Sequence, residues 1–251
     1  MEIRLDGKAM LITGASTGLG RAAAIEAATS GAFVGVHYRQ SEEAARQTVD
    51  AITAAGGQAC LVQGDVTCRA DVDGVFDEFL GASNGRLDVL VNNAGALVRR
   101  TSIAELDDES WNEVIAVNMT STFLCSQRAI PIMKSQGGGA IINISSIAAM
   151  IGGAGGSVHY AAAKGGVNAL TIGLAKELAP FNIRVTAIMP GVIPTPFHDK
   201  FSSPELLEKW RKAIPLRRLG RPEDIAAAVV YLASDRAQFI TNSTLKISGG
   251  W

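Results

Sequence analysis

The stretch "AMLITGASTGLG", residues 9–20, decides the fold of this chain. Its first five residues are apolar and β-branched enough for a buried strand, and the residues after Gly18 have the composition of a helix. Between them Gly14, Gly18 and Gly20 form the spacing G-x3-G-x-G. Such glycines let the backbone approach a phosphate, and the helix N-terminus then offers unpaired N–H groups to it. The stretch predicts the start of a dinucleotide-binding βαβ unit; the alternative is a tight turn whose glycines serve packing alone.

The same alternation of strand and helix continues along the chain. We expect strands at 9–13, 33–38, 59–63, 87–91, 140–145, 183–189 and 244–248, and helices at about 18–30, 41–55, 69–81, 108–134, 157–179 and 222–233. Residues 190–221, rich in proline and charge, are expected to be irregular. Strands that alternate with helices of this length indicate a parallel sheet with right-handed crossovers. The predicted fold class is α/β: a single doubly wound Rossmann domain over 1–251, with seven parallel strands and helices on both faces.

Composition excludes several classes of function. The net charge is −1, so no basic field favours nucleic acid or an anionic membrane as partner. The three cysteines and three histidines are scattered, and we predict no metal site. The chain has neither a leader pattern nor an apolar run of about 18 residues, so we expect a cytoplasmic protein acting on a small molecule.

The residue that follows the second strand bears on cofactor choice. In a doubly wound sheet, ligands bind beyond the carboxyl ends of the strands. An acid after this strand would accept hydrogen bonds from a ribose 2′-hydroxyl, whereas arginine pairs with a 2′-phosphate. Here Tyr38 and Arg39 stand at that place, with the Ser41 hydroxyl nearby. The pattern favours NADP, with NAD possible; a solvated arginine at a helix start is the alternative.

The next two strands also end in polar or small residues. Asp65 and Val66 follow the third strand, where the carboxylate could accept from an adenine amino group or cap the next helix. Asn92, Ala94 and Gly95 follow the fourth strand. They leave room for adenosine; the alternative is a structural turn without ligand contact.

Five motifs in a fixed order now identify a resemblance. They are TGxxxGxG at 13–20, NNAG at 92–95, Asn118, the set Ser146, Tyr160-x3-Lys164, and PG…T at 190–195. In this order, each at a predicted strand end or on the following helix, they make the whole chain resemble the short-chain dehydrogenase/reductase family. The segments at 158–166 and 214–226 and the closing SGG are similar to its glucose-dehydrogenase and 3-oxoacyl-reductase branches.

The resemblance implies the catalytic roles. Tyr160 and Lys164 are four residues apart and share one helix face. Tyr160 would exchange a proton with the substrate oxygen, helped by a pKa that the Lys164 ammonium and a charged nicotinamide lower. Ser146 would hold the substrate oxygen, and Asn118 would link Lys164 to solvent. The family's serine usually lies 13 residues before the tyrosine, where this chain has Ile147. We assign the role to Ser146, 14 residues before Tyr160, and keep Ser145 as the alternative.

The resemblance also completes the cofactor site and the function. Lys164 would hold the nicotinamide ribose, Thr195 and the Ile193 backbone its carboxamide, and residues 190–221 would form a substrate lid. The predicted cofactor residues are Gly14, Ser16, Thr17, Gly18, Leu19, Gly20, Tyr38, Arg39, Ser41, Asp65, Val66, Asn92, Ala94, Gly95, Tyr160, Lys164, Pro190, Gly191, Ile193 and Thr195. We expect an NADP-preferring oxidoreductase of a ketone or secondary alcohol, a sugar or polyol being favoured, and a homotetramer. The rivals are a 3-oxoacyl-thioester reductase and a non-catalytic NADP(H)-binding sensor.

Basic residues gather in two further places, at Arg99-Arg100 and between Arg211 and Arg221. They could attract an anionic substrate or carrier thioester. A solvated face with salt bridges is the simpler interpretation and the one we expect. His159, next to Tyr160, is expected to be structural.

Overall fold

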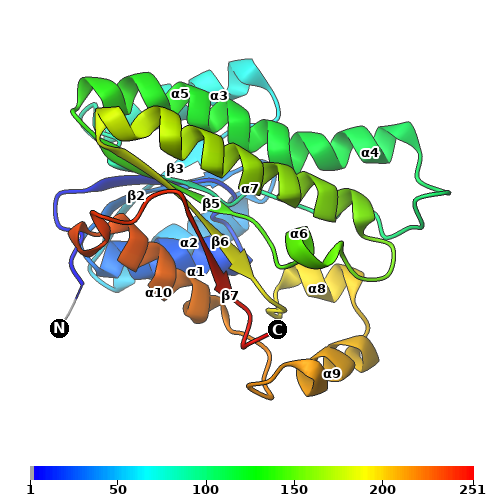
Figure 1. Ribbon diagram of the computed structural model, residues 1–251. Coiled ribbons are helices and arrows are strands. Elements are labelled where there is room, and N and C mark those ends of the chain that lie inside the picture. The colour runs from blue at the N-terminus through cyan, green and yellow to red at the C-terminus, as the bar shows by residue number, and fades with distance from the viewer. Residues whose placement is uncertain (1–2) are drawn as a thin grey trace.

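The computed structural model describes residues 3–251, and these are organised around one sheet (Figure 1). Its seven strands lie in the order β3-β2-β1-β4-β5-β6-β7, and all neighbours pair in parallel. The predicted seven-stranded parallel sheet is therefore confirmed. The strands are β1 (Ala9–Ile12), β2 (Phe33–Tyr38), β3 (Gln58–Gln63), β4 (Val89–Asn92), β5 (Gly139–Ile144), β6 (Ile183–Pro190) and β7 (Ser243–Ile247).

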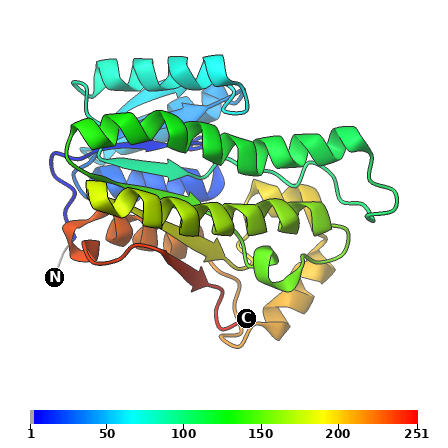
Figure 2. The ribbon, with the colours of Figure 1, turned by 45° about the horizontal axis from the view of Figure 1, so that its top comes forward.

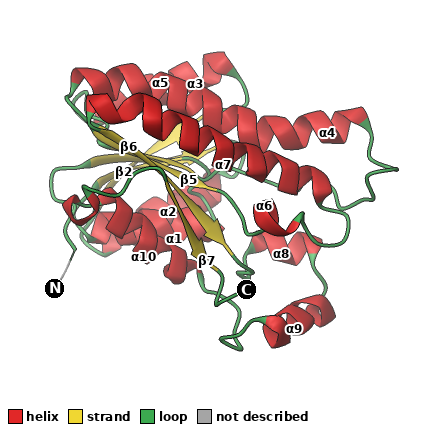
Figure 3. Ribbon diagram, viewed as in Figure 1, coloured by secondary structure: helices red, strands yellow, loops and turns green. Residues whose placement is uncertain are grey.

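Helices cover both faces of the sheet, as Figures 1 and 3 show. One face carries α1 (Gly18–Thr29), α2 (Glu42–Ala54) and α10 (Pro222–Ala233). The other carries α3 (Arg69–Ala82), α5 (Ser121–Ser135) and α7 (Val158–Leu178), with α4 (Asp108–Ile115) extending beyond it. Short 3₁₀ turns are η2 (Ala179–Phe181) and η3 (Asp235–Ala237). Because both faces are covered, the central strands are almost entirely apolar.

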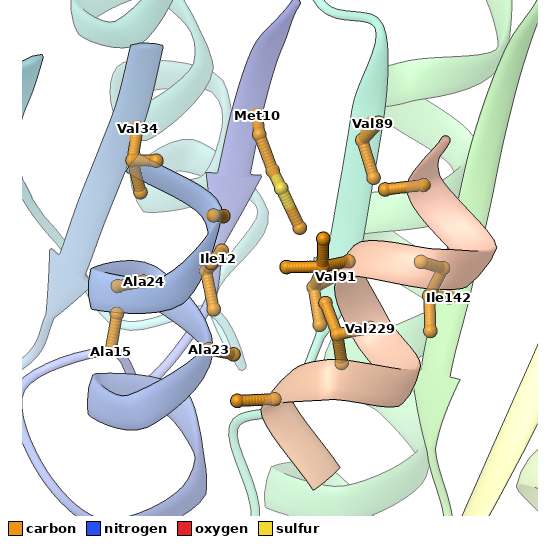
Figure 4. Close-up of a cluster of buried hydrophobic side chains, with 14 of the residues drawn as sticks. Met10, Ile12, Ala15, Ala23, Ala24, Val34, Val89, Val91, Ile142 and Val229 are labelled. Atoms are coloured by element: carbon orange, nitrogen blue, oxygen red, sulfur yellow. The ribbon is translucent and has the colours of Figure 1, made fainter. Parts of the chain in front are cut away.

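The core on the α1 face shows how the first strand and helix fit together (Figure 4). Met10 and Ile12 of β1 face Ala23 and Ala24 of α1, and Val229 of α10 packs beside them. All five side chains are at most 2% exposed. Burial of each large one stabilises the fold by about 1.5–3 kcal/mol. The alanines let α1 lie close to the sheet, which sets the position of its N-terminus.

The prediction that 190–221 is irregular was wrong. The segment contains α8 (Pro196–Phe201) and α9 (Pro204–Ala213), which lie beyond the carboxyl end of the sheet (Figure 2). The reason is local: Ser203 caps α9 by accepting a hydrogen bond from the Leu206 N–H at 3.3 Å, and Pro204 occupies the first helical position. A further short helix, α6 (Ala148–Ile151), follows β5. We call Pro196–Ala213 the α8–α9 segment.

Among the described residues, no helix is both long enough and apolar enough to cross a membrane.

Candidate active site

A cavity of about 710 Å³ opens at the carboxyl ends of the strands. Its walls come from the segments that follow β1 to β6, from the first turns of α7, and from the α8–α9 segment. Most predicted site residues line it: Gly14, Ser16, Thr17, Gly18, Leu19, Tyr38, Arg39, Ser41, Asp65, Val66, Ala94, Gly95, Ser146, Tyr160, Lys164, Pro190, Gly191, Ile193 and Thr195. Three do not line it: Gly20, Asn92 and Asn118.

Gly20 packs against the loop rather than facing the cavity. A Cβ at this position would lie 2.3 Å from the carbonyl oxygen of Gly14 and 2.5 Å from Asn93 Nδ2. Asn93, the second residue of the NNAG motif, donates through Nδ2 to the carbonyl oxygens of Thr13 at 2.8 Å and Gly14 at 3.0 Å. Gly20 and Asn93 therefore pack against the loop at Thr13 and Gly14 and hold its backbone in place.

The N-terminus of α1 suits an anion. The Thr17 side chain makes no capping hydrogen bond, and the first turn has no acidic residue. The first N–H groups of the helix are thus left for another acceptor, and Gly18, at φ 56°, brings the backbone to the cavity wall. These features fit the pyrophosphate of a dinucleotide.

His37 is a residue of this site that sequence reasoning missed. It is 2% exposed, and its Nδ1 accepts a hydrogen bond from the Gly14 N–H at 3.0 Å. Its Nε2 lies 3.1 Å from the carbonyl oxygen of Gly64, so Nε2 carries the proton and donates it there. Burial lowers the pKa of His37 to about 4, which keeps the ring neutral. The sequence feature that could have indicated this role is the position of His37, one residue before the end of a buried strand.

Arg39 and Asp65 form a pair at the cavity wall, with Arg39 Nη1 3.3 Å from Asp65 Oδ2. Asp65 Oδ1 accepts from the Thr67 backbone N–H and hydroxyl at 2.9 and 2.7 Å. The alternative that Asp65 caps the next helix was wrong, because the N-cap residue of α3 is Cys68. Burial opposes ionisation of Asp65, but the Thr67 hydrogen bonds and the Arg39 charge outweigh it and lower its pKa. Half of the Arg39 side chain is exposed, so the guanidinium can turn to another anion.

Asn92 lies in the sheet interior and ties two strands together. Its Nδ2 donates to Asn143 Oδ1 at 2.8 Å and to Ser126 Oγ at 3.1 Å. Asn143 Nδ2 in turn donates a hydrogen bond to Thr171 Oγ1 at 2.9 Å. The structural alternative for Asn92 fits this position, because the side chain is 4% exposed and away from the cavity.

Asn118 sits in a π-helical turn, Ala116–Thr120, which interrupts the predicted helix 108–134. Such turns are frequent at functional sites. Its Nδ2 donates to the carbonyl oxygens of Ala96 at 2.7 Å and Val114 at 2.9 Å. Its Oδ1 is buried without a partner among the described residues. A Cβ on Gly95 would lie 2.7 Å from that oxygen and 3.1 Å from Lys164 Nζ, so glycine keeps this corner open.

Lys164 reaches back to the sheet beneath the tyrosine. Its Nζ donates to the Ile144 carbonyl oxygen at 2.8 Å and lies 5.8 Å from the centre of the Tyr160 ring. The side chain is 3% exposed, and burial lowers its pKa to about 8. Helix α7 thus places amine and phenol on one face, as their spacing predicted.

The two candidate serines have different partners. Ser146 lies close enough to the Tyr160 phenol to lower its pKa, and its Oγ accepts a hydrogen bond from the Ala148 N–H at 3.1 Å. Ser145 is 2% exposed and donates to the Lys164 carbonyl oxygen at 3.1 Å. Burial raises the pKa of Tyr160 to about 12, and Ser146 opposes this rise. We had expected Lys164 to lower the pKa of Tyr160. In the protein without cofactor, desolvation is instead the largest effect on this pKa, and the phenol is protonated at neutral pH.

Arg100 is not the solvated residue that we expected. Its Nη1 donates to the carbonyl oxygens of Ala154 and Gly155, each at 2.5 Å, and its Nε to that of Phe201 at 3.0 Å. It therefore joins the loop before α7 to the end of α8. Arg99, in contrast, is exposed and pairs with Asp107 at 3.0 Å, as a solvated residue would.

The other basic cluster is paired at the surface as expected, since Arg211 contacts Glu208 and Arg218 contacts Asp224, each at 2.6 Å. His159 is buried with Nε2 2.9 Å from the Arg99 carbonyl oxygen, which fits a structural histidine.

Together the parallel sheet, the cleft at its carboxyl edge and the residues that meet there define an oxidoreductase of the Rossmann type. The chain belongs to the short-chain dehydrogenase/reductase family: residues 14–251 match a family model described as enoyl-(acyl carrier protein) reductase. It is 43% identical to 3beta-hydroxysteroid dehydrogenase 1 of Eggerthella lenta, covering 98% of this chain and 94% of that protein. It is 40% identical to the 3-oxoacyl-(acyl-carrier-protein) reductase FabG of Staphylococcus aureus, covering 97% of each. A solved structure of 7 alpha-hydroxysteroid dehydrogenase, complexed with NADH and 7-oxo glycochenodeoxycholic acid, is 35% identical and aligns with a TM-score of 0.94 over 99% of this chain and 96% of that one.

Proposed function

We propose that this protein interconverts a ketone and a secondary alcohol, with NADP as its preferred cofactor. The observation that carries the proposal is the meeting of Ser146, Tyr160 and Lys164 in one wall of the cavity. Bound nicotinamide supplies the hydride for reduction or accepts it in oxidation. The chain's own residues bind the reactants, orient them and move the proton.

Tyr160 serves as the proton donor in the reductive direction. Its high pKa, which burial raises to about 12, keeps the phenol protonated at neutral pH. The Ser146 hydroxyl, which lies close to this phenol, is placed to bind the same substrate oxygen. We assign this role to Ser146 and not to Ser145, whose hydroxyl is held by the backbone of α7. Lys164 and the open corner beside Asn118 and Gly95 provide the route by which Tyr160 regains a proton.

The NADP preference rests on Arg39 and Ser41. Both line the cavity after β2, where an adenosine ribose would lie in such a fold. Neither is acidic, and the exposed pair with Asp65 holds Arg39 only weakly. Arg39 can therefore turn to a 2′-phosphate. NAD is the rival cofactor, and the Asp65 carboxylate beside Arg39 would favour it.

Reduction can be followed by the absorbance of NADPH and NADH over a panel of aldoses, ketoses, simple ketones and an acetoacetyl thioester. We expect Tyr160→Phe to lower kcat by about 10²–10⁴-fold while NADPH still binds. Arg39→Ala should raise KM for NADPH and leave KM for NADH nearly unchanged. Equal KM values for the two cofactors in the wild type would refute the NADP preference.

Two rivals make different predictions in the same assay. A sensor binds NADPH but turns over no carbonyl, and Tyr160→Phe then has no effect. A 3-oxoacyl-thioester reductase, favoured by the 40% identity to an enzyme of that name, turns over the acetoacetyl thioester best.

A homotetramer in the cytoplasm completes the proposal. The tetramer is supported by apolar surface on the described residues: Phe239 is fully exposed, Ile172 is 44% exposed and Leu245 41%. Light scattering coupled to gel filtration tests it, and a monomer would contradict it.

A further inference from the structure

A continuous series of aromatic rings leads outward from the proposed proton donor. The Phe197 ring centre lies 5.7 Å from that of Tyr160, and Phe197 also contacts Phe201 at 5.4 Å. His198 continues the series from Phe197 at 5.2 Å to Trp210 at 5.8 Å. We call Phe197, His198, Phe201, Trp210 and Trp251 the ring wall; all five line the cavity.

The ring wall is supported from behind. Trp210 is 8% exposed and packs with Val192 and Ile214 in a small apolar cluster, against which Trp251 also rests. The ring centres of Trp210 and Trp251 are 6.4 Å apart. The ring wall is therefore supported by apolar packing at Trp210 and Trp251.

Aliphatic side chains complete this end of the cavity. Leu97, Ile147 and Val192 line it, and each is at most 6% exposed. Nearly all of their surface is therefore already in contact with other protein groups. A substrate that extends from Tyr160 meets rings and alkyl groups.

Three polar side chains at this end, those of Ser157, Arg100 and His198, are hydrogen-bonded to other groups of the chain. Ser157 Oγ accepts from the Ala154 N–H and donates to the Ala154 carbonyl oxygen, both at 2.9 Å. The guanidinium of Arg100 donates hydrogen bonds to three backbone carbonyl oxygens. His198 Nδ1 lies 2.9 Å from Ser202 Oγ. Glu113 and Lys200 are exposed to solvent.

We infer that the ring wall selects a bulky, largely apolar cyclic ketone or secondary alcohol, and that this end of the cavity disfavours sugars and polyols. The inference rests on the proposed function, since it places the reacting oxygen at Ser146 and Tyr160. One carbonyl oxygen finds partners there, and the rest of a cyclic skeleton lies on ring faces, which adds to affinity. Each sugar hydroxyl that lies against the ring wall would lose water without gaining a partner, at a cost of about 1–3 kcal/mol. This inference replaces the sugar or polyol that we expected from the sequence resemblance.

The test is a series of carbonyl substrates with NADPH. It contains cyclohexanone, the fused bicyclic 2-decalone, fructose, and an acetoacetyl thioester. We expect kcat/KM for 2-decalone to exceed that for cyclohexanone by about tenfold, because the second ring adds several buried methylenes. Fructose should be turned over most slowly. A kcat/KM for fructose or the thioester equal to or above that for 2-decalone overturns the inference and leaves the proposed reaction intact.

Variants of the ring wall separate recognition from folding. Phe197→Leu keeps an apolar side chain but removes the ring face next to Tyr160. It should raise KM for 2-decalone by about tenfold and leave that for cyclohexanone nearly unchanged. Phe181→Leu is the matched control, because Phe181 is 43% exposed and contacts Lys134, outside the cavity. The inference is wrong if both variants change the two KM values alike.

Binding provides a readout that does not depend on turnover. Calorimetric titration of the NADPH-loaded protein with 2-decalone should show saturable binding that Phe197→Leu weakens by about tenfold. If no carbonyl is reduced but 2-decalone binds in this way, the proposed reaction fails while the ring-wall inference stands. If 2-decalone does not bind, the inference fails.

Discussion

A fall in pH from about 7 to about 5 should destabilise this protein through His37. In the folded chain the ring is buried, accepts a hydrogen bond from Gly14 and donates one to Gly64. A proton on Nδ1 would remove the acceptor and leave a buried charge. Burial accordingly lowers the pKa of His37 from 6.5 to about 4, although the Gly64 carbonyl and the Asp65 charge both oppose the fall.

The sign and size follow from linkage. Between pH 6.5 and 4 the unfolded chain binds a proton at His37 that the folded chain does not bind. The free energy of unfolding therefore decreases as the pH falls through this window, and stops decreasing below about 4. From pH 7 to pH 5 the two pKa values give a loss of about 2 kcal/mol. Over the whole window the loss is about 3 kcal/mol.

Urea unfolding of wild type and His37→Asn at both pH values measures this contribution. Carboxylates that titrate in both proteins cancel in the comparison. The variant should be less stable at pH 7 by about 1–3 kcal/mol, because buried Gly14 and Gly64 groups lose their partner. It should then lose about 2 kcal/mol less than wild type on going to pH 5. Equal losses in the two proteins would show that His37 is not the titrating group.

Three further substitutions test contacts of the site. Gly20→Ala should cost about 1–3 kcal/mol in urea unfolding and weaken NADPH binding, because its Cβ meets the loop backbone at 2.3 Å, whereas Gly74→Ala, with open space around it, should not destabilise. Arg100→Met should raise the ketone KM and speed proteolysis of the loops that it joins, whereas Arg99→Met should change the free energy of unfolding by at most about 0.5 kcal/mol. Asn92→Leu should lower the free energy of unfolding by about 1–3 kcal/mol, since the acceptor that it served is left buried without a donor; an unchanged urea midpoint would contradict this.

The sequence was sufficient for the sheet because the information there is local. Apolar runs of strand length alternate with helical patterns, and α10 begins at Pro222, where proline and two acidic residues predicted its start. The α8–α9 segment was missed because the pairs at the starts of its helices, Thr195-Pro196 and Ser203-Pro204, also occur in turns.

The site was predictable where a residue's role depends on its place after a strand, and not where it depends on a partner far away in the chain. Gly14 and Thr17 are of the first kind and line the cavity. Arg100 is of the second, because its acceptors are more than 50 residues distant and nothing in the pair Arg99-Arg100 distinguishes the two. His37 is also of the second kind, since its role is to accept a hydrogen bond from Gly14, which follows a different strand.

These long-range contacts connect substrate selection with proton transfer. Arg100 ties the end of α8 to the loop before α7, and this places Phe197 against Tyr160. Desolvation is the largest cause of the raised Tyr160 pKa, and the Phe197 ring of α8 lies against this phenol. Loss of the Arg100 contacts would let water reach the phenol and bring its pKa back toward 10. The Arg100 contacts thus place ring faces for the substrate beside the residue that donates the proton.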